Sequence, residues 1–136
     1  MSSETQTQTP SENQIQPINY ENVKAFERKY NARQTKEKVV EITYLPKWNL
    51  KELIQDAMEY ANVMQKVVRI LGVYSLGFGR NISITITPKG FVRFSIMLGF
   101  RIGLDRPNAI DVTPQDIPVL KLLLEQVEKI VEELQS

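Results

Sequence analysis

One stretch, residues 81–106, constrains the fold more than any other part of the 136-residue chain. The even positions from Ile82 to Ile86 are all isoleucine, and an apolar row at even positions resumes at Val92 and continues to Ile102. Alternation with a period of two, rich in β-branched and aromatic residues, is typical of strands with one buried face. The stretch therefore predicts a long antiparallel hairpin.

The turn of this hairpin decides which residues face each other. A two-residue loop at residues 88–89 would pair Ile86 with Phe91 and would mix the two faces. A three-residue loop at residues 88–90 pairs Ile86 with Val92 and keeps the isoleucine row opposite the even-numbered apolar row. The loop reads Pro-Lys-Gly, in which proline suits the first corner of a type I turn and glycine suits the left-handed position that follows. We therefore predict the three-residue loop.

The opposite face of the hairpin combines two arginines with small hydroxyl residues, a methionine and one large aromatic residue, and it has no acid. It comprises Ser83, Thr85, Thr87, Phe91, Arg93, Ser95, Met97 and Arg101. A solvent-exposed sheet face has such a composition. A platform for single-stranded nucleic acid has it too, because arginine pairs with phosphate and an exposed phenylalanine stacks on a base. Both interpretations stay open at this point.

The amino-acid composition makes several classes of function less probable, above all enzymes and metal-binding proteins. The chain has no histidine and no cysteine, which removes the commonest general base, thiol nucleophiles and most zinc ligands. Since no carboxylates form a recognisable pair either, we expect no enzyme, no catalytic residues, and no metal or other cofactor. No apolar run approaches the roughly 20 residues of a membrane span, and the N-terminus lacks the pattern of a signal peptide. We therefore expect a cytoplasmic protein without a membrane partner.

Charge is distributed unevenly, although the net charge is only +1. Residues 1–19 carry two acids and no base, residues 20–106 carry 15 bases and eight acids, and residues 107–136 carry two bases and six acids. Such segregation predicts a basic binding surface and a separate acidic end.

The chain divides into a tail and one domain. Residues 1–19 are polar residues and proline with almost nothing to bury, and they predict a disordered tail. Residues 20–136 predict a single α+β domain. Within it, Tyr20 to about Lys38 predicts a basic helix, and residues 39–45 predict a short strand.

Asn49 starts the clearest internal helix, because a glutamate three positions later completes a capping box. An apolar stripe then runs to Leu71, and Gly72 predicts the end of the helix. Residues 73–78 predict a strand before the hairpin, and residues 107–112 predict a short strand after it. The sequence therefore predicts a three- or four-stranded antiparallel sheet covered by helices.

The last helix, at about residues 114–135, starts at a Thr-Pro-Gln-Asp sequence, and Pro118 moves the start of its regular part to near Ile117. Apolar residues then repeat at alternating spacings of three and four, which forms a heptad-like dimerisation seam. The seam comprises Leu120, Leu124, Val127, Val131 and Leu134. Leu123 and Ile130 add a second stripe. We expect one stripe to pack on the sheet and the other to meet a partner helix in a homodimer. The alternative is one wide stripe buried within the monomer.

This order of elements resembles the single-stranded DNA-binding proteins of archaea and archaeal viruses that lack an OB-fold. These are the ThermoDBP-like proteins of hyperthermophilic archaea and the similar protein of rod-shaped archaeal viruses. The resemblance covers roughly residues 49–135. It is strongest at residues 112–130, VTPQDIPVLKLLLEQVEKI, which follow a strand pair such as ITITPKGFVRFSIML.

The resemblance implies helices packed on an antiparallel sheet, a dimer through the terminal helix, and single-stranded DNA in a cleft lined with basic and aromatic residues. The hairpin face departs from this pattern, because Phe91 is its one clear aromatic residue. Tyr44, Trp48, Tyr74 or Phe78 would have to supply further stacking.

The residues predict sequence-tolerant binding of single-stranded nucleic acid by a homodimer, with phosphate contacts from basic residues and base stacking on exposed aromatics, and the resemblance implies that the nucleic acid is DNA. The nucleic-acid-binding residues would be Arg80, Lys89, Phe91, Arg93, Met97, Arg101 and Arg106. The alternative is a non-enzymatic structural or adaptor dimer that binds another protein through the exposed hairpin face, since Met and Phe beside Arg suit protein interfaces. A double-stranded DNA regulator would need a recognition helix with base-reading side chains on one face, and no such helix is obvious.

Overall fold

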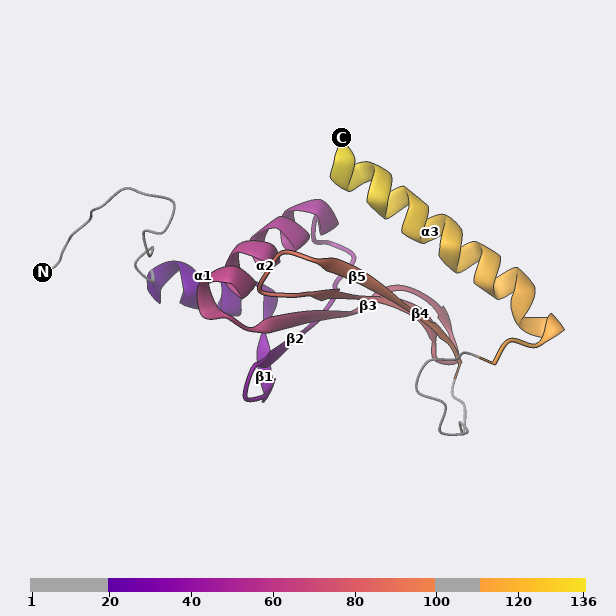
Figure 1. Cartoon of the computed structure of the whole chain (residues 1–136), viewed down its shortest axis with the longest axis horizontal. Helices are drawn as coiled ribbons and strands as arrows, with labels where there is room; N and C mark the ends of the chain where they lie inside the picture. Colours follow the sequence, from indigo (N-terminus) through magenta and orange to yellow (C-terminus); the bar gives the residue numbers. More distant parts are fainter. Residues whose placement is uncertain (1–19, 100–110) are drawn as a thin grey trace, which may run out of the picture.

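The structure is a computed structural model, and it describes residues 20–99 and 111–136. The elements in these two ranges are α1 (Tyr20–Tyr30), β1 (Arg33–Lys36), β2 (Val39–Thr43), α2 (Leu50–Met64), β3 (Val67–Gly77), β4 (Arg80–Ile86), β5 (Val92–Leu98), the 3-10 helix η1 (Pro114–Asp116) and α3 (Ile117–Gln135). The five strands form one sheet in the order β1-β2-β3-β4-β5. Figure 1 shows α2 and α3 on the same side of this sheet. The predicted α+β class is confirmed.

The β4–β5 hairpin has the predicted register. Its opposed pairs include Ile82 with Ile96, Ile84 with Phe94, and Ile86 with Val92. The Gly90 N–H donates to the Thr87 carbonyl over 2.9 Å, and the Thr87 N–H donates to the Phe91 carbonyl over 3.0 Å. Gly90 has a φ of +91°, so this glycine takes the left-handed position that a three-residue loop requires.

The sheet is larger than the three or four antiparallel strands predicted, and it is mixed. β2 and β3 pair in parallel, from Val39 with Val67 to Thr43 with Leu71, whereas the other neighbours are antiparallel. The parallel pair arises because α2 carries the chain from the end of β2 back to the start of β3, as a β-α-β crossover does. The prediction of an all-antiparallel sheet was wrong at this pair.

The first helix, α1, ends at Tyr30, before the predicted end near Lys38. Asn31 is left-handed, with a φ of +52°. Its N–H donates to the Arg28 carbonyl, and the Ala32 N–H donates to the Glu27 carbonyl over 2.9 Å, which is the pattern of a Schellman cap. No apolar stripe continues beyond Tyr30 to hold a longer helix against the core. The chain therefore turns into the edge strand β1.

The second helix, α2, begins where predicted and ends earlier. The Asn49 side chain accepts a hydrogen bond from the Glu52 N–H over 2.9 Å. Gln65 is left-handed, with a φ of +54°, and ends the helix. The chain enters β3 at Val67, so the predicted continuation to Leu71 was wrong. Val-Val-Arg-Ile favours a strand through its β-branched residues, and pairing with both β2 and β4 outweighs the helical stripe.

The apolar core lies on the face of the sheet that α2 and α3 cover, and it has two parts. The larger part joins α1, α2 and Ile130 of α3 to β2, β3 and β4, and its fully buried residues include Ile42, Leu53, Ile54, Ile70 and Ile84. The smaller part consists of Ile82, Leu98 and Leu123 with the apolar side chains around them. α3 thus covers the end of the sheet that α2 does not reach.

The last helix, α3, begins at Ile117, as predicted, after η1. The Thr113 N–H and hydroxyl both donate to Asp116 Oδ2, over 2.8 and 3.0 Å. The second predicted stripe of α3, Leu123 and Ile130, is buried in the monomer. The predicted dimerisation seam is divided: Leu120, Val127 and Leu134 also pack on the core, Val131 is half-buried, and Leu124 is 46% exposed.

Two predictions fall partly or wholly outside the described residues. These are the tail at residues 1–19 and the strand at residues 107–112, of which Asp111 and Val112 are described and belong to no helix or strand. Within the described ranges, neither α1, α2 nor α3 combines the length and the apolar character that crossing a membrane requires.

Truncating Leu123 to alanine should lower the free energy of unfolding by about 2–5 kcal/mol, because it leaves a cavity at a fully buried site. The same truncation of its neighbour Leu124 should change the free energy of unfolding by no more than about 1 kcal/mol at low protein concentration. Urea denaturation followed by circular dichroism measures both values. Equal losses for the two variants would contradict the orientation of α3.

Candidate nucleic-acid interface

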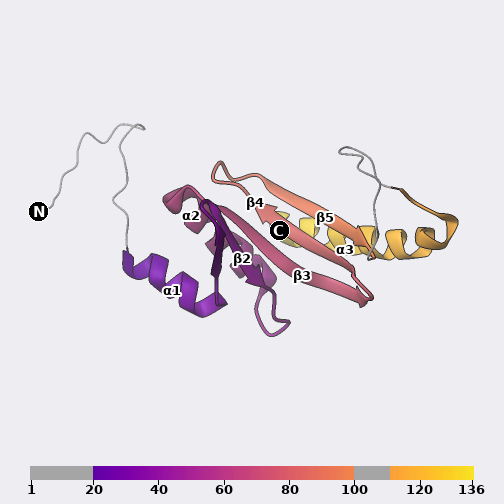
Figure 2. The ribbon, with the colours of Figure 1, turned by 90° about the horizontal axis from the view of Figure 1, so that it is seen from below.

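The face of the sheet opposite α2 and α3 is not covered by any described helix. Figure 2 views it directly, with the strands in front of α2 and α3. In β5, exposed Arg93, Ser95 and Met97 alternate with residues that point to the helices. The strand register extends this surface over the other strands. We call it the open face, and it comprises Arg33, Val39, Glu41, Thr43, Val67, Arg69, Leu71, Ser75, Asn81, Ser83, Thr85, Thr87, Arg93, Ser95 and Met97. Ser83 is the member that its neighbours bury, at 9% exposure.

One row of residues crosses all five strands on the open face. The register pairs Arg33 with Glu41, Glu41 with Arg69, Arg69 with Thr85, and Thr85 with Arg93. Residues directly opposite each other in neighbouring strands share a face and lie about 5 Å apart. We call these five residues the arginine row, because they place three guanidinium groups on β1, β3 and β5 with a single carboxylate between two of them.

The arginines of this row differ in their partners. Arg69 Nη1 lies 3.4 Å from Glu41 Oε2, and Arg33 Nη2 lies 3.8 Å from Glu41 Oε1. Arg33 Nη2 also donates to Thr43 Oγ1 over 3.2 Å. Arg93 is exposed and forms no ion pair with any residue that the structure describes. Arg93 therefore presents its full set of N–H donors at the β5 edge.

The β4–β5 turn brings three of the predicted binding residues together. Phe91 is 64% exposed, and its N–H donates to Thr87 Oγ1 over 3.1 Å. Lys89 is exposed in the same turn, and Arg93 follows two residues after Phe91 on β5. Met97 is 48% exposed near the other end of β5. An exposed ring beside two cations is an arrangement that can hold a base and its phosphate.

A second exposed aromatic ring, that of Phe78, stands at the β3–β4 turn. Phe78 is 84% exposed and left-handed, with a φ of +54°, and Gly79 follows with a φ of +76°. Two consecutive left-handed residues form the type I′ turn, which glycine and asparagine favour and a bulky residue strains. Strain retained at an exposed aromatic favours a role in binding. The sequence signal was GFGRN, an aromatic residue between two glycines.

The structure does not bring Arg80 onto the open face. Arg80 pairs with Leu98, which puts it in the row that faces the helices. Its Nε donates to the Gly77 carbonyl over 3.0 Å, and its Nη2 donates to the Leu76 carbonyl over 3.1 Å. Its guanidinium carbon lies 5.5 Å from the centre of the Phe78 ring. Arg80 therefore secures the turn and supports Phe78, while Arg101 and Arg106 lie outside the described residues.

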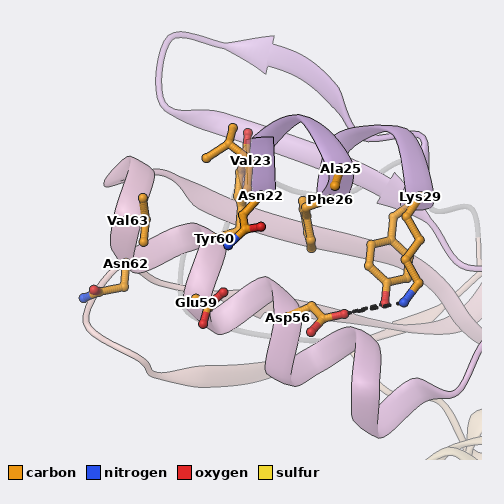
Figure 3. Close-up of a pocket in the computed structure, with 11 residues that line it drawn as sticks. Asn22, Val23, Ala25, Phe26, Lys29, Asp56, Glu59, Tyr60, Asn62 and Val63 are labelled. Carbon is orange, nitrogen blue, oxygen red and sulfur yellow. Dashed lines mark hydrogen bonds and ion pairs between the residues drawn. The ribbon is translucent and has the colours of Figure 1, made fainter. Parts of the chain in front are cut away.

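A cavity of about 640 Å³ lies on the helix side, between α1 and α2. Figure 3 shows Phe26 and Tyr60 there, with Asp56 of α2 reaching toward Lys29 of α1. The Tyr60 hydroxyl donates to Glu27 Oε2 over 2.7 Å, and the Tyr30 hydroxyl donates to Asp56 Oδ2 over 2.7 Å. The rings of Phe26 and Tyr60 stack at a centroid distance of 4.4 Å. These contacts engage the carboxylates in holding α1 against α2.

Comparison of the chain with protein-family models, with curated proteins and with solved structures finds no match. No three His, Cys, Asp or Glu side chains come together as a potential metal site in residues 20–99 and 111–136. The fold and the open face thus define an α+β protein with a one-sided mixed sheet, and its function has to be inferred from that surface.

The tyrosines between α1 and α2 should make stability sensitive to alkaline pH. Burial and the hydrogen bond to Asp56 raise the pKa of Tyr30 to about 12, and burial and the hydrogen bond to Glu27 also raise the pKa of Tyr60. Because these pKa values exceed that of an unfolded tyrosine, about 10, the stabilisation is complete below pH 10 and is lost as pH rises toward 12. Each tyrosine should contribute up to about 1.4 kcal/mol per pH unit to this fall.

Urea unfolding at pH 9 and pH 11 tests this sensitivity. Tyr60→Phe should lose less free energy of unfolding between the two pH values than the unmodified protein does, since phenylalanine cannot ionise. Tyr20→Phe, at an exposed position, is the control and should keep the original pH dependence. An unchanged pH dependence in Tyr60→Phe would show that its hydroxyl does not contribute to the fall.

Proposed function

We propose that the protein binds single-stranded DNA on the open face, with little sequence preference, and that it acts as a homodimer. The observation that carries the proposal is the arginine row together with the exposed Phe91 ring. The open face as defined above contains three arginines, several small hydroxyl residues and one acid, Glu41. Arginine forks match phosphate geometry, and small neighbours allow the backbone of a strand to approach.

The length of the row suits several consecutive phosphates. Five strands about 4.8 Å apart give a row of about 19 Å. A stacked strand carries one phosphate per about 3.4 Å along its axis, so the row has the length of about five to six of them. A nucleic-acid strand would therefore cross the β-strands along the row instead of following one hairpin.

Aromatic rings stand at both ends of β4. Phe91 follows the turn after this strand, and Phe78 lies in the turn before it. β4 has seven residues, so the two rings are about 20 Å apart at 3.3 Å per residue. Stacking on exposed rings tolerates any base, because every base offers a π-face. The Phe91 ring, which follows the register onto the uncovered side, therefore supports binding without strict sequence preference, whereas the Phe78 ring contacts Arg80 of the row that faces the helices.

The charge on the side of the molecule that carries α3 also favours binding of nucleic acid at the open face. The outward surface of α3 carries exposed Glu125, Glu128 and Glu132, with Lys121 and Lys129 among them. An acidic helix side repels a polyanion and a basic sheet side attracts it. A strand approaching the protein would thus be steered to the open face.

The homodimer rests on Leu124 and Val131, the outer residues of the predicted seam, and on Ile117, which precedes Leu124 by seven residues. Ile117, Leu124 and Val131 recur every seven residues along α3, and Ile117 and Leu124 are 42% and 46% exposed. Packing this row against a second copy would remove apolar surface from water. Two open faces in one particle would also strengthen binding to a long strand through avidity. The resemblance to the archaeal single-stranded DNA-binding proteins implies the same two properties.

Two substitutions on the open face should weaken binding in different ways. Arg93→Ala should reduce affinity for a labelled mixed-sequence oligonucleotide, and it should flatten the dependence of log affinity on log salt by about 0.7, the value for one phosphate contact. Phe91→Ala should reduce affinity by about 1–3 kcal/mol while the salt dependence stays nearly fixed, because it removes stacking and no charge. Fluorescence anisotropy at several salt concentrations measures both quantities.

Lys121→Ala on α3 is the matched control for the loss of one positive charge, and it should leave both quantities nearly unchanged. Phe91→Ala binding as tightly as the unmodified protein would exclude the stacking role. If the unmodified protein does not bind single strands even at low salt, the proposed function fails. The adaptor dimer, with Phe91 and Met97 contacting a protein, would then be favoured.

Leu124→Asp should convert the dimer into a folded monomer, because the aspartate is exposed in the monomer and would be buried without a partner in the dimer. Leu122→Asp is a matched control, since Leu122 is also 46% exposed but lies on the opposite flank of α3. Sedimentation velocity should show a monomer for the first variant and a dimer for the second. An unmodified protein that sediments as a monomer at high micromolar concentration would contradict the proposal.

A further inference from the structure

Glu41 is the one acid among the open-face residues named above, and it lies on β2 between Arg33 of β1 and Arg69 of β3. Its two carboxylate oxygens point to different arginines, Oε1 to Arg33 on β1 and Oε2 to Arg69 on β3. The Glu41 side chain is 22% exposed, whereas those of Arg33 and Arg69 are 47% and 42% exposed. The two guanidinium groups therefore partly cover the carboxylate and remain open to solvent themselves.

The contacts of Glu41 are loose. Its N···O distances of 3.4 and 3.8 Å exceed the roughly 2.7–2.9 Å of a tight charge-assisted hydrogen bond. The ion pair between Lys29 and Glu52, on the helix side of the same protein, has such a tight distance, 2.8 Å. Arg69 Nη1 still donates a hydrogen bond to Glu41 Oε2 at 3.4 Å, but both arginines are more than two-fifths exposed. Ion pairs with exposed partners contribute little to stability, so folding alone gives a weak reason for an acid at this position.

The charge of Glu41 opposes the function proposed for the surface around it. With Glu41 ionised, the three side chains carry a net charge of +1 in place of +2. A phosphate that approaches Arg33 and Arg69 meets the carboxylate as a like charge within a few ångströms. Each guanidinium has five N–H donors and can release the carboxylate while its other donors contact a phosphate.

We propose that Glu41 is an internal competitor for phosphate, which occupies Arg33 and Arg69 in the free protein and is displaced from them by a bound strand. The inference rests on the proposed function, and it extends the binding surface from the β4–β5 hairpin to β1 and β3. Glu41 acts here through the two arginines and is a positioning residue. Its competition weakens binding and speeds release, because most differences in affinity at one surface arise from the dissociation rate.

Glu41→Gln keeps the size of the side chain and removes its charge. The affinity for a labelled oligonucleotide at low salt should rise by at least about fivefold, which corresponds to the roughly 1 kcal/mol that a like charge 4 Å away costs even in bulk water. The dependence of log affinity on log salt should also become steeper by about 0.7, since one further phosphate is neutralised. A loss of folding stability alone would not steepen this dependence.

Three further variants make the test specific. Glu132→Gln on α3 changes the net charge equally, away from the open face, and should leave the salt dependence unchanged. In an Arg69→Ala background, the gain from Glu41→Gln should shrink, because coupled residues are not additive. Glu41→Thr supplies a second neutral side chain that favours a strand, in case the glutamine variant does not fold.

The possible results separate this inference from the proposed function. If the unmodified protein binds and the neutral Glu41 variants show the same affinity and salt dependence, the competitor role is wrong and the function stands. Weaker binding by these variants would overturn the inference as well, by showing that the carboxylate holds the arginines ready for phosphate. If no oligonucleotide binds, inorganic polyphosphate is the second probe. Tighter binding of polyphosphate by Glu41→Gln would then support the competitor role although the proposed function had failed.

Discussion

Burial of only one face of the sheet is the constraint on which the rest of this structure depends. α2 and α3 lie on the same side of the sheet, and the isoleucines of β4 are fully buried beneath them. Because successive side chains in a strand point to opposite faces, this packing commits every other residue of β4 and β5 to the uncovered side. The chemistry of that side is then free of the demands of the core, and it is there that arginine, threonine and serine accumulate.

The hairpin could be predicted from the sequence because its signals are local. A period of two over many residues and a Pro-Lys-Gly loop determine the register of β4 and β5 without reference to the rest of the chain. The start of α2 at Asn49 and the start of α3 at Ile117 were predicted for the same reason, since capping acts within one turn of helix. Phe91, Arg93 and Met97 were placed on the uncovered side of the hairpin by this register alone.

The parts of the structure that were not predicted depend on contacts between segments that are distant in the sequence. Residues 67–71 fit an apolar helical stripe and a strand equally well, and only the neighbours β2 and β4 decide for the strand. The arginine row was missed because Glu41 lies opposite Arg69 in the parallel pair of β2 with β3. The sequence had been interpreted as an all-antiparallel sheet, in which this pair does not occur. Arg33 had been assigned to a helix that ends three residues before it. The left-handed Phe78 could not be inferred from the two neighbouring glycines alone.

The arginine row also couples ligand binding to the folding equilibrium. Its members come from strands that are separated along the chain, so they are neighbours only while all five strands are paired. An unfolded chain offers the same charges without their spacing, and a ligand that needs the spacing binds the folded state alone. By mass action, such a ligand stabilises the fold in proportion to the logarithm of its concentration above its dissociation constant. Part of this added stability reaches β1, the short edge strand that carries Arg33, because the strand must stay paired for the row to remain complete.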